Sequence, residues 1–281
     1  MILFKKQLEI NNFISARKKQ GNKIGFVPTM GALHAGHLSL LEAAKKQNGI
    51  TVCSIFVNPT QFNDPKDFEK YPITIENDIY LLEKAGCDIV FLPSADEIYP
   101  NGIKENYYYN LGYLETILEG KYRPGHFQGV CQVVHLLLNI VQPDNLYLGQ
   151  KDYQQCMVIK RLIEITSLKT NIIICPTLRE PDGLAMSSRN LRLTEAERSD
   201  ALSIYKALCL IKNEIKPGNI NNLKQKAIDY LSAKGFKVDY VEIANAANLD
   251  ANEEWNGQTP LVALCAAFLN EVRLIDNLLL S

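Results

Sequence analysis

Two of the four histidines in the chain lie in one short segment together with two glycines, Pro28–His37 (PTMGALHAGH). The segment joins a predicted buried strand, Lys23–Thr29, to a predicted helix that begins near Gly36. Glycine permits a close approach of the backbone to a ligand, and the first N–H groups of a helix favour phosphate. His34 and His37, three residues apart, add imidazole donors on the same side. This combination predicts a site for a nucleotide triphosphate and for charge that develops on its α-phosphate.

A zinc site is an alternative interpretation of the histidine pair, but no third or fourth ligand lies nearby in the sequence. The remaining histidines, His126 and His135, are about ninety residues away. His135 lies in the apolar run VVHLLL and is expected to be a buried core residue. Ordinary turn glycines and surface histidines are the other alternative. The concentration of two of only four histidines in one turn favours the phosphate site.

Amide side chains follow the next predicted strand, Ile50–Asn58, in the sequence FVNPTQF. Asn58 and Gln61 can bind the hydroxyl and carboxylate groups of a small polar ligand. Asn-Pro at a strand end is also common in simple turns. Because ligands of such sheets bind at the carboxyl ends of the strands, these amides are expected at the same edge as the histidine segment.

A third polar segment, Gly149–Gln155, follows the predicted strand Asn145–Gly149 and opens a helix. Lys151 offers a cation for phosphate, and Asp152 can cap the helix or hold Mg²⁺ or a ribose. Gln155 lies one turn further on, over the same edge. An Asp N-cap beside a solvated lysine is an equally supported interpretation of these residues taken alone.

A fourth segment, Asp182–Asn190 (DGLAMSSRN), combines two hydroxyls and a guanidinium on a loop that contains glycine. Ser187, Ser188 and Arg189 suit a clamp that closes over a triphosphate. A polar linker whose serine caps a helix is the alternative, and the sequence of this segment alone does not separate the two.

A fifth cluster, Gly120–Gly129, contains Lys121, Arg123 and His126 among several glycines. This composition suggests an anion-facing loop. For His126 itself a structural role is favoured over contact with a substrate.

Short apolar runs alternate with helical patterns through the first part of the chain. This alternation predicts an α/β fold with a doubly wound parallel sheet. The predicted strands are Lys23–Thr29, Ile50–Asn58, Asp88–Pro93, Asn145–Gly149 and Asn171–Pro176, and the predicted helices are Gly36–Gln47, Thr74–Ala85, Gln128–Val141 and Asp152–Ile165.

The pattern changes after Pro176. Thr194-Glu195-Ala196-Glu197 is a capping box that opens a helix to about Ile215, and a second helix ends near Lys234. Predicted strands follow at Lys237–Ile243, Leu261–Leu269 and Val272–Leu278. We therefore expect a first domain at residues 1–176 and a smaller α+β domain at residues 177–281.

The composition excludes several classes of protein. Lys+Arg number 30 and Asp+Glu 31, so the net charge of −1 lacks the basic footprint of a nucleic-acid binder. No apolar run reaches the roughly 18 residues that span a membrane, and the first residues lack the features of a signal peptide. Seven widely spaced cysteines without a C-x-x-C pair indicate buried free thiols in a reducing compartment. We expect a cytoplasmic protein that binds neither membranes nor nucleic acids.

The polar segments, taken together, resemble the pantoate–β-alanine ligase (pantothenate synthetase) family. The resemblance covers nearly the whole chain and is densest in PTMGALHAGH, SIFVNPTQF, YRPGHFQGV, GQKDYQQ and REPDGLAMSSRN, which occur in the order of the family. The H-x-G-H loop alone is less specific, because it marks a superfamily of nucleotidyltransferases and class I aminoacyl-tRNA synthetases.

The resemblance implies a Rossmann-like first domain that binds nucleotide and pantoate, and a second domain that acts as a lid. It implies an ATP- and Mg²⁺-dependent ligation in two steps. The pantoate carboxylate attacks the α-phosphorus of ATP and gives pantoyl adenylate and pyrophosphate. The amine of β-alanine then attacks the acyl carbon, which releases AMP and forms pantothenate. It further implies a homodimer.

The resemblance also assigns roles to residues of this chain. It implies catalytic roles for His34, His37, Lys151 and Arg189, and a metal ligand in Asp152. The implied ATP-binding residues are Met30, Gly31, Ala32, Leu33, His34, Ala35, Gly36, His37, Gly149, Gln150, Lys151, Asp152, Leu178 (by its backbone), Met186, Ser187, Ser188 and Arg189. The implied residues for pantoate and β-alanine are Gln61, Gln155, Asn58 and Arg123, with Tyr71 and Asp78 as further candidates. Gln150 departs from the family, which often has an acidic residue there.

Two other functions fit parts of the sequence. An adenylyltransferase that joins AMP to a phosphorylated cofactor precursor would need a second phosphate site, which Asn58, Gln61 and Gln155 do not obviously supply. A non-catalytic nucleotide-binding module would keep the histidine loop but lose the clamp and the amides, and both of these are present.

Overall fold

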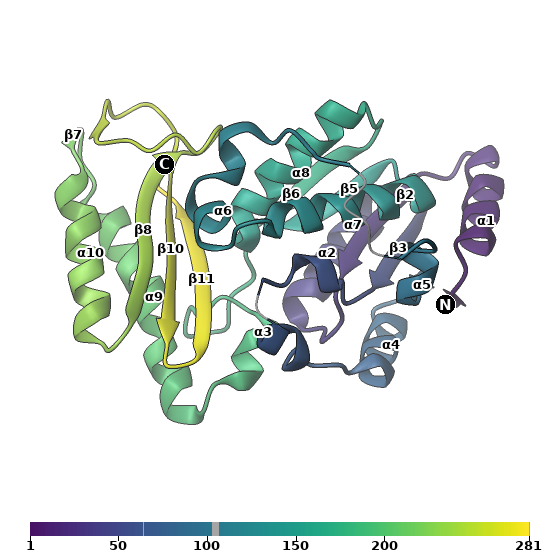
Figure 1. Cartoon of the computed structure of the whole chain (residues 1–281), viewed down its shortest axis with the longest axis horizontal. Coiled ribbons are helices and arrows are strands. Elements are labelled where there is room, and N and C mark those ends of the chain that lie inside the picture. Colours follow the sequence, from purple (N-terminus) through teal and green to yellow (C-terminus); the bar gives the residue numbers. More distant parts are fainter. Residues whose placement is uncertain (64, 103–106, 281) are drawn as a thin grey trace. The chain divides into compact units, whose positions relative to one another are not determined.

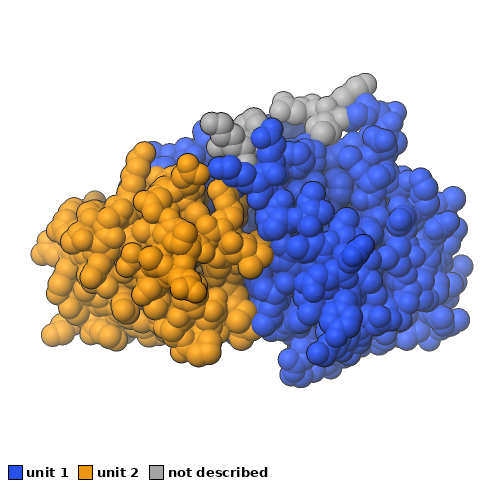
Figure 2. All heavy atoms as spheres, turned by 90° about the horizontal axis from the view of Figure 1, so that it is seen from below, with its two compact units in different colours: residues 1–149, 155–176 blue, residues 150–154, 177–281 orange. Residues whose placement is uncertain are grey.

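The computed structural model describes residues 1–63, 65–102 and 107–280, and the chain folds into two compact units. Unit 1 comprises Met1–Gly149 and Gln155–Pro176, and unit 2 comprises Gln150–Gln154 and Thr177–Ser281, coloured blue and orange in Figure 2. The short segment Gln150–Gln154, which we expected in the first domain, thus belongs to unit 2. The nucleotide-binding and lid roles of the two domains stay predictions, and Ser281 lies outside the described residues.

Unit 1 is built on a six-stranded parallel sheet with the strand order β1-β4-β3-β2-β5-β6. Figure 1 labels β2, β3, β5 and β6 of this sheet. Its strands are β1 (Ile2–Phe4), β2 (Ile24–Thr29), β3 (Ile50–Ile55), β4 (Ile89–Phe91), β5 (Asn145–Gly149) and β6 (Asn171–Cys175). The predicted α/β fold with a parallel sheet is confirmed. The chain winds from β2 toward β4 and then returns to the other side of β2 with β5. The strand order therefore reverses between β2 and β5, where sheets of this kind bind ligands at the strand carboxyl ends.

Helices cover both faces of this sheet. They are α1 (Gln7–Lys19), α2 (Ala35–Gln47), α3 (Pro65–Glu69), α4 (Ile75–Lys84), α5 (Ala95–Ile98), α6 (Leu118–Tyr122), α7 (His126–Val141) and α8 (Tyr153–Thr166). Val27, Cys53 and Tyr147 share one core cluster with residues of α2 and α4. Phe26 and Leu146, next to them in the strands, are fully buried and point to the opposite face because side chains alternate along a strand.

Unit 2 contains an antiparallel sheet with the order β11-β10-β8. Its strands are β8 (Lys237–Asn245), β10 (Leu261–Leu269) and β11 (Val272–Leu279), and a separate pair is formed by β7 (Gly218–Asn219) and β9 (Glu254–Trp255). Two helices, α9 (Glu195–Glu214) and α10 (Asn221–Ala233), pack on the sheet and share its core. Thr194 and Glu197 form the predicted capping box of α9.

All seven cysteines are free thiols, and six of them are buried. Burial raises the pKa of the Cys87 thiol to about 11 and also raises the pKa of Cys175. The prediction of buried free thiols is therefore confirmed. Within residues 1–63, 65–102 and 107–280, no helix has both the length and the apolarity needed to cross a bilayer.

The loop between β2 and α2 takes an unusual backbone conformation that a buried carboxylate holds in place. Gly31 has a φ of 81° and Ala32 a φ of 49°, both in the left-handed region. Asp78 of α4 is fully buried, and its Oδ2 accepts the N–H of Ala32 at 3.0 Å. Its Oδ1 accepts the N–H of Leu33 at 2.7 Å and the hydroxyl of Thr74 at 3.1 Å. A Cβ on Gly31 would lie 2.9 Å from Oδ2, so glycine also makes room for this carboxylate.

We expect Asp78→Asn to destabilise unit 1. An amide offers only one acceptor oxygen, so its NH₂ group must face either the N–H of Ala32 or that of Leu33. Leaving a buried donor without its acceptor costs roughly 1–3 kcal/mol. Urea unfolding would measure the loss. Glu76→Gln, an exposed change on the same helix, is the matched control, and equal stability of the two variants would contradict the role given to Asp78.

Candidate active site

His34 and His37 form a pair at the N-terminus of α2. His34 is the N-cap residue, and its Nδ1 accepts the N–H of Gly36 at 3.1 Å. The Nδ1 of His37 accepts the N–H of His34 at 3.4 Å. The ring centroids are 4.0 Å apart. Because each Nδ1 serves as an acceptor, the neutral rings carry their proton on Nε2. Both imidazoles therefore present an N–H donor beside the positive end of the helix.

Gln61 lies next to the histidine loop, as expected from its place after the neighbouring strand. It ends the 3-10 helix η1 (Pro59–Gln61), which follows β3. Its Nε2 is 2.6 Å from Sδ of Met30, the first residue of the loop after β2. The structure thus brings two of the predicted segments together within unit 1.

Asn58 is almost completely buried, with 1% of its surface exposed. Its Oδ1 accepts the hydroxyl of Tyr99 at 2.8 Å, and its Nδ2 donates to the Gly129 carbonyl at 3.2 Å and to Thr60 Oγ1 at 2.9 Å. Burial raises the pKa of Tyr99, so its hydroxyl stays a neutral donor. Asn58 therefore supports the turn that carries Gln61, and its predicted contact with substrate stays a prediction.

Arg123 and His126 hold the main chain of Gln61 through its carbonyl oxygen. The carbonyl oxygen of Gln61 lies 2.7 Å from His126 Nδ1 and accepts from Arg123 Nη2 at 3.3 Å. Arg123 Nη1 is 3.1 Å from His126 Nε2 and 3.7 Å from the carboxylate of Glu119. His126 is 6% exposed, which agrees with its expected structural role. The arrangement fixes where the Gln61 side chain begins.

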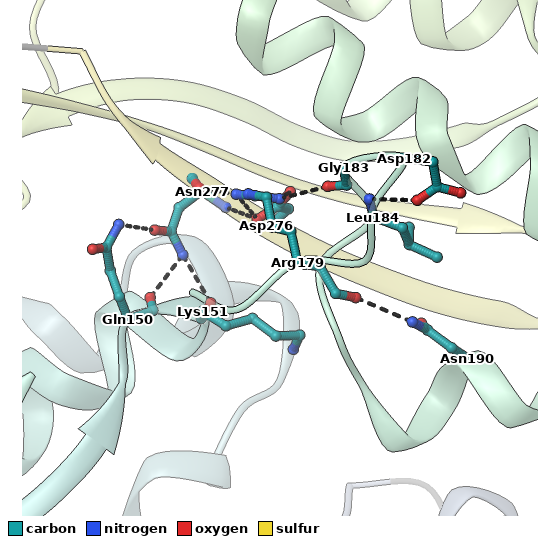
Figure 3. A network of polar contacts seen from close by, with 10 residues as sticks. Gln150, Lys151, Arg179, Asp182, Gly183, Leu184, Asn190, Asp276 and Asn277 are labelled. Atoms are coloured by element: carbon teal, nitrogen blue, oxygen red, sulfur yellow. Dashed lines mark hydrogen bonds and ion pairs between the residues drawn. The ribbon is translucent and has the colours of Figure 1, made fainter. Parts of the chain in front are cut away.

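Gly149 ends β5, and the 3-10 helix η3 (Gln150–Asp152) follows it in unit 2. Lys151 is mostly covered, with 17% of its side chain exposed, and its Nζ lies 3.5 Å from Asp152 Oδ1. The carbonyl oxygens of Gln150 and Lys151 both accept hydrogen bonds from Asn277 Nδ2, at 2.9 and 2.8 Å (Figure 3). Gln155, in the part of α8 that belongs to unit 1, is half-buried.

The predicted clamp begins with a hairpin in unit 2. The N–H of Met186 donates to the carbonyl of Leu178 at 3.1 Å, and Arg179 pairs with Ala185. Beyond the hairpin, Ser187 caps the 3-10 helix η4 (Ser188–Arg192), since its Oγ accepts the N–H of Arg189 at 3.2 Å. The capping serine that we considered as the alternative to a clamp is therefore present. Phosphate binding by Met186, Ser187, Ser188 and Arg189 stays a prediction.

Asp152 is the carboxylate predicted to contact a metal. Its side chain is 46% exposed and lies beside Lys151. In the described part of the chain, no three His, Cys, Asp or Glu side chains gather closely enough to hold a metal ion. Mg²⁺ bound to a nucleotide needs only one or two carboxylates, because phosphates and waters supply its other oxygen ligands. Asp152 has the donor chemistry for that role.

Several residues that position the candidate segments were not predicted from the sequence. Tyr99 and Gly129 support Asn58, and a Cβ on Gly129 would collide with the carbonyl of Thr60. Gly129 stands in the motif YRPGHFQGV, so its presence there was a usable signal. Arg179 and Asn277 gave no such signal, because their contacts join parts of the chain about a hundred residues apart.

The chain is similar to known proteins over nearly its whole length. The sequence model of the family described as pantoate-beta-alanine ligase matches residues 2–279. A protein of Cytophaga hutchinsonii named pantothenate synthetase is 46% identical over 270 residues, which are 95% of each chain. The pantothenate synthetase of Pseudothermotoga lettingae is 44% identical and covers 100% of this chain and 99% of its own.

Solved structures give the same result. A pantothenate synthetase from Thermus thermophilus superposes with a TM-score of 0.91 at 37% identity and covers 99% of each chain. A pantoate-beta-alanine ligase from Francisella tularensis, solved in complex with beta-gamma ATP and beta-alanine, has a TM-score of 0.81 at 40% identity. It covers 99% of this chain and 97% of its own. The chain therefore belongs to the pantoate–β-alanine ligase family, and it is an enzyme of the ligase class.

Proposed function

We propose that this ligase joins pantoate to β-alanine through a pantoyl adenylate, with ATP as the second substrate of the first step. The observation that carries the proposal is the pair of imidazoles, His34 and His37, at the N-terminus of α2, next to the point where the strand order of the sheet reverses. The family relationship supports it, and so does the relative from Francisella tularensis that binds a form of ATP and β-alanine.

The first step is attack of a pantoate carboxylate oxygen on the α-phosphorus of ATP. A new P–O bond forms while the bond to pyrophosphate breaks, and negative charge builds up on the α-phosphate oxygens. We propose that His34 and His37 donate Nε2–H hydrogen bonds to this charge, with the N–H group of Ala35 in the same helix turn. Donors that are already aligned before the reaction stabilise such charge most effectively, because they need no reorganisation.

Gln61 supplies an amide for the polar groups of pantoate, and Gln155 is the second amide predicted for it. The hydroxyl and carboxylate groups of pantoate need both donors and acceptors, which carboxamides provide. The Gln61 main chain is held through its carbonyl by Arg123 and His126. This anchoring restricts the orientation in which the carboxylate meets the phosphorus.

In unit 2, we propose that Lys151 and Arg189 contact ATP phosphates, with Met186, Ser187 and Ser188 beside them. Asp152 is the residue that would contact a nucleotide-bound Mg²⁺, which supplies charge neutralisation on the phosphates. Homodimer formation and a cytoplasmic location also stay predictions.

The second step consumes the adenylate. The β-alanine amine attacks the acyl carbon, the C–O bond to AMP breaks, and the amide of pantothenate forms. An enzyme that retains the adenylate protects it from water, which would otherwise hydrolyse the activated acid. A competing adenylyltransferase activity would need a second phosphate site near Gln61, where the cation Arg123 already pairs with Glu119 and the main chain.

The function is tested by incubating the protein with ATP, Mg²⁺, pantoate and β-alanine and measuring AMP and pantothenate. We expect AMP to accumulate only when both pantoate and β-alanine are present, since one turnover of adenylate otherwise remains bound. AMP formation that is independent of either acid, or a dinucleotide-type product by mass spectrometry, would contradict the proposal.

We expect His37→Ala to slow adenylate formation by on the order of 10²-fold, because a preorganised transition-state donor is lost. Single-turnover release of pyrophosphate measures this step directly. Lys46→Ala, an exposed change at the far end of α2, is the control and should leave the rate unchanged. A normal single-turnover rate in His37→Ala would rule out the role of this imidazole.

We expect Gln61→Ala to raise the KM for pantoate more than the KM for ATP. The amide contacts the acid in this account, whereas the loop after β2 contacts the nucleotide. Steady-state kinetics with each substrate varied in turn separates the two constants, and Gln20→Ala on the exposed surface serves as the control. An increase confined to the KM for ATP would show that Gln61 is misassigned.

A further inference from the structure

Two adjacent residues of β11, Asp276 and Asn277, are polar and buried at the C-terminal end of the chain. They are 5% and 2% exposed. Side chains alternate along a strand, so neighbours point to opposite faces of the sheet. Val272 and Leu274 lie in the core that the sheet shares with α9 and α10, and Asp276 continues their face of the strand. Asn277 therefore points to the other face, where the strand contacts η3.

The Asn277 carboxamide makes three hydrogen bonds to η3. Its Nδ2 donates to the carbonyl oxygens of both Gln150 and Lys151, at 2.9 and 2.8 Å. Its Oδ1 accepts from Gln150 Nε2 at 3.2 Å. The last contact fixes which end of the amide faces the carbonyls, because only the oxygen can accept from Gln150. Figure 3 shows the Lys151 side chain pointing away from Asn277, so Asn277 holds only the main chain of this lysine.

Asp276 holds the base of the hairpin that leads to the predicted clamp. Its carboxylate accepts two hydrogen bonds from Arg179, at 2.6 and 3.0 Å. Burial raises the pKa of Asp276, while the cations of Arg179 and Lys151 oppose this shift. Arg179 also donates to the carbonyl oxygens of Gly183 and Asn277, at 3.2 and 3.1 Å, and stacks 4.2 Å from the Tyr205 ring centroid.

The two sets of contacts join in one short stretch of main chain. Arg179 donates to the carbonyl of Asn277, and the N–H of Asn277 donates to Asp276 Oδ1 at 2.8 Å. A shift of this dipeptide would therefore move η3 and the hairpin together. Enzymes align charged groups on a ligand by holding those groups in place with residues that are themselves fixed by further hydrogen bonds.

We propose that Asn277 is a positioning residue for the ATP-binding segment Gln150–Asp152, with its amide oriented by Gln150. Through Asp276 and Arg179, the same strand keeps this segment in register with the hairpin before Met186. The inference rests on the proposed function, because it concerns binding of ATP by Lys151. It also gives a reason for glutamine at position 150. The amide nitrogen of Gln150 donates to Asn277, and an acidic residue at this position would lack that donor.

The test uses Asn277→Asp in the full chain. The new carboxylate keeps the size of the side chain and can still accept from Gln150, but it faces two carbonyl oxygens without a donor. We expect kcat/KM for ATP to fall by on the order of 10²-fold, as for a misplaced catalytic group. The KM for β-alanine, measured at saturating ATP, should stay within about twofold, because the amine acts in the later step.

A milder variant keeps the test valid if Asn277→Asp does not fold. Gln150→Ala removes one neutral hydrogen bond and should lower kcat/KM for ATP by roughly fivefold. Asn277→Ala and the double variant Gln150→Ala/Asn277→Ala complete the comparison. The fold-loss in kcat/KM for ATP of the double variant should be smaller than the product of the fold-losses of Gln150→Ala and Asn277→Ala, because the two residues act through the same contact. Lys212→Ala is the control, since it removes an exposed hydrogen bond to Leu279 on the same strand without touching η3.

The outcomes separate this inference from the proposed function. Absence of pantoate-dependent AMP formation in the unaltered protein would overturn the proposed function. If that activity is present, equal values of kcat/KM for ATP in Asn277→Asp and Lys212→Ala would overturn the positioning role. A parallel fall in the kinetic constants of all three substrates would also overturn it, because that result indicates a general loss of structure.

Discussion

The proposed chemistry depends on one constraint, because a buried carboxylate fixes the conformation of the loop after β2. Asp78 accepts hydrogen bonds from two successive N–H groups of this loop and from Thr74 at the start of its own helix. Ala32 adopts a left-handed conformation that is unfavourable for a residue with a Cβ. The buried carboxylate offsets that cost. The loop therefore enters α2 in one conformation, with His34 at the N-cap and both imidazoles oriented by their Nδ1 acceptors.

The same principle recurs at the other candidate segments. The Gln61 main chain is held by Arg123 and His126, and Asn58 donates a hydrogen bond to Thr60 in the same turn. In unit 2, Asn277 holds the main chain of Gln150 and Lys151. In each case the group predicted to meet a ligand projects from a backbone that a second, buried polar group has fixed. Such support limits the backbone freedom that substrate binding must remove.

Much of the fold follows from local patterns in the sequence. The inner strands β2, β3 and β5 are continuous apolar runs because both faces of a parallel sheet are covered, so they were predictable. The capping box of α9 is an equally local signal. The edge strand β1 is half exposed and only three residues long, and it was not predicted. Gln150–Gln154 groups with unit 2, where η3 contacts the distant strand β11, and no local pattern indicates a contact of this kind.

The candidate site was predictable where motifs are local, and its supports were not. His34, His37 and Gln61 stand at strand ends, where residue type and position together indicate a role. Asn58 also stands at a strand end, yet its amide makes hydrogen bonds within the protein, to Tyr99 and Gly129. Asn277 lies 127 residues from Gln150 in an otherwise ordinary strand. No short pattern can reveal a contact of that kind.

The structure of the protein with a non-hydrolysable ATP analogue and pantoate tests the central claim most directly. The account predicts the α-phosphate oxygens within about 3 Å of the Nε2 atoms of His34 and His37. It also predicts a pantoate carboxylate oxygen in line with the bond to the leaving phosphate. A triphosphate bound elsewhere, with both imidazoles out of hydrogen-bonding range, would contradict it.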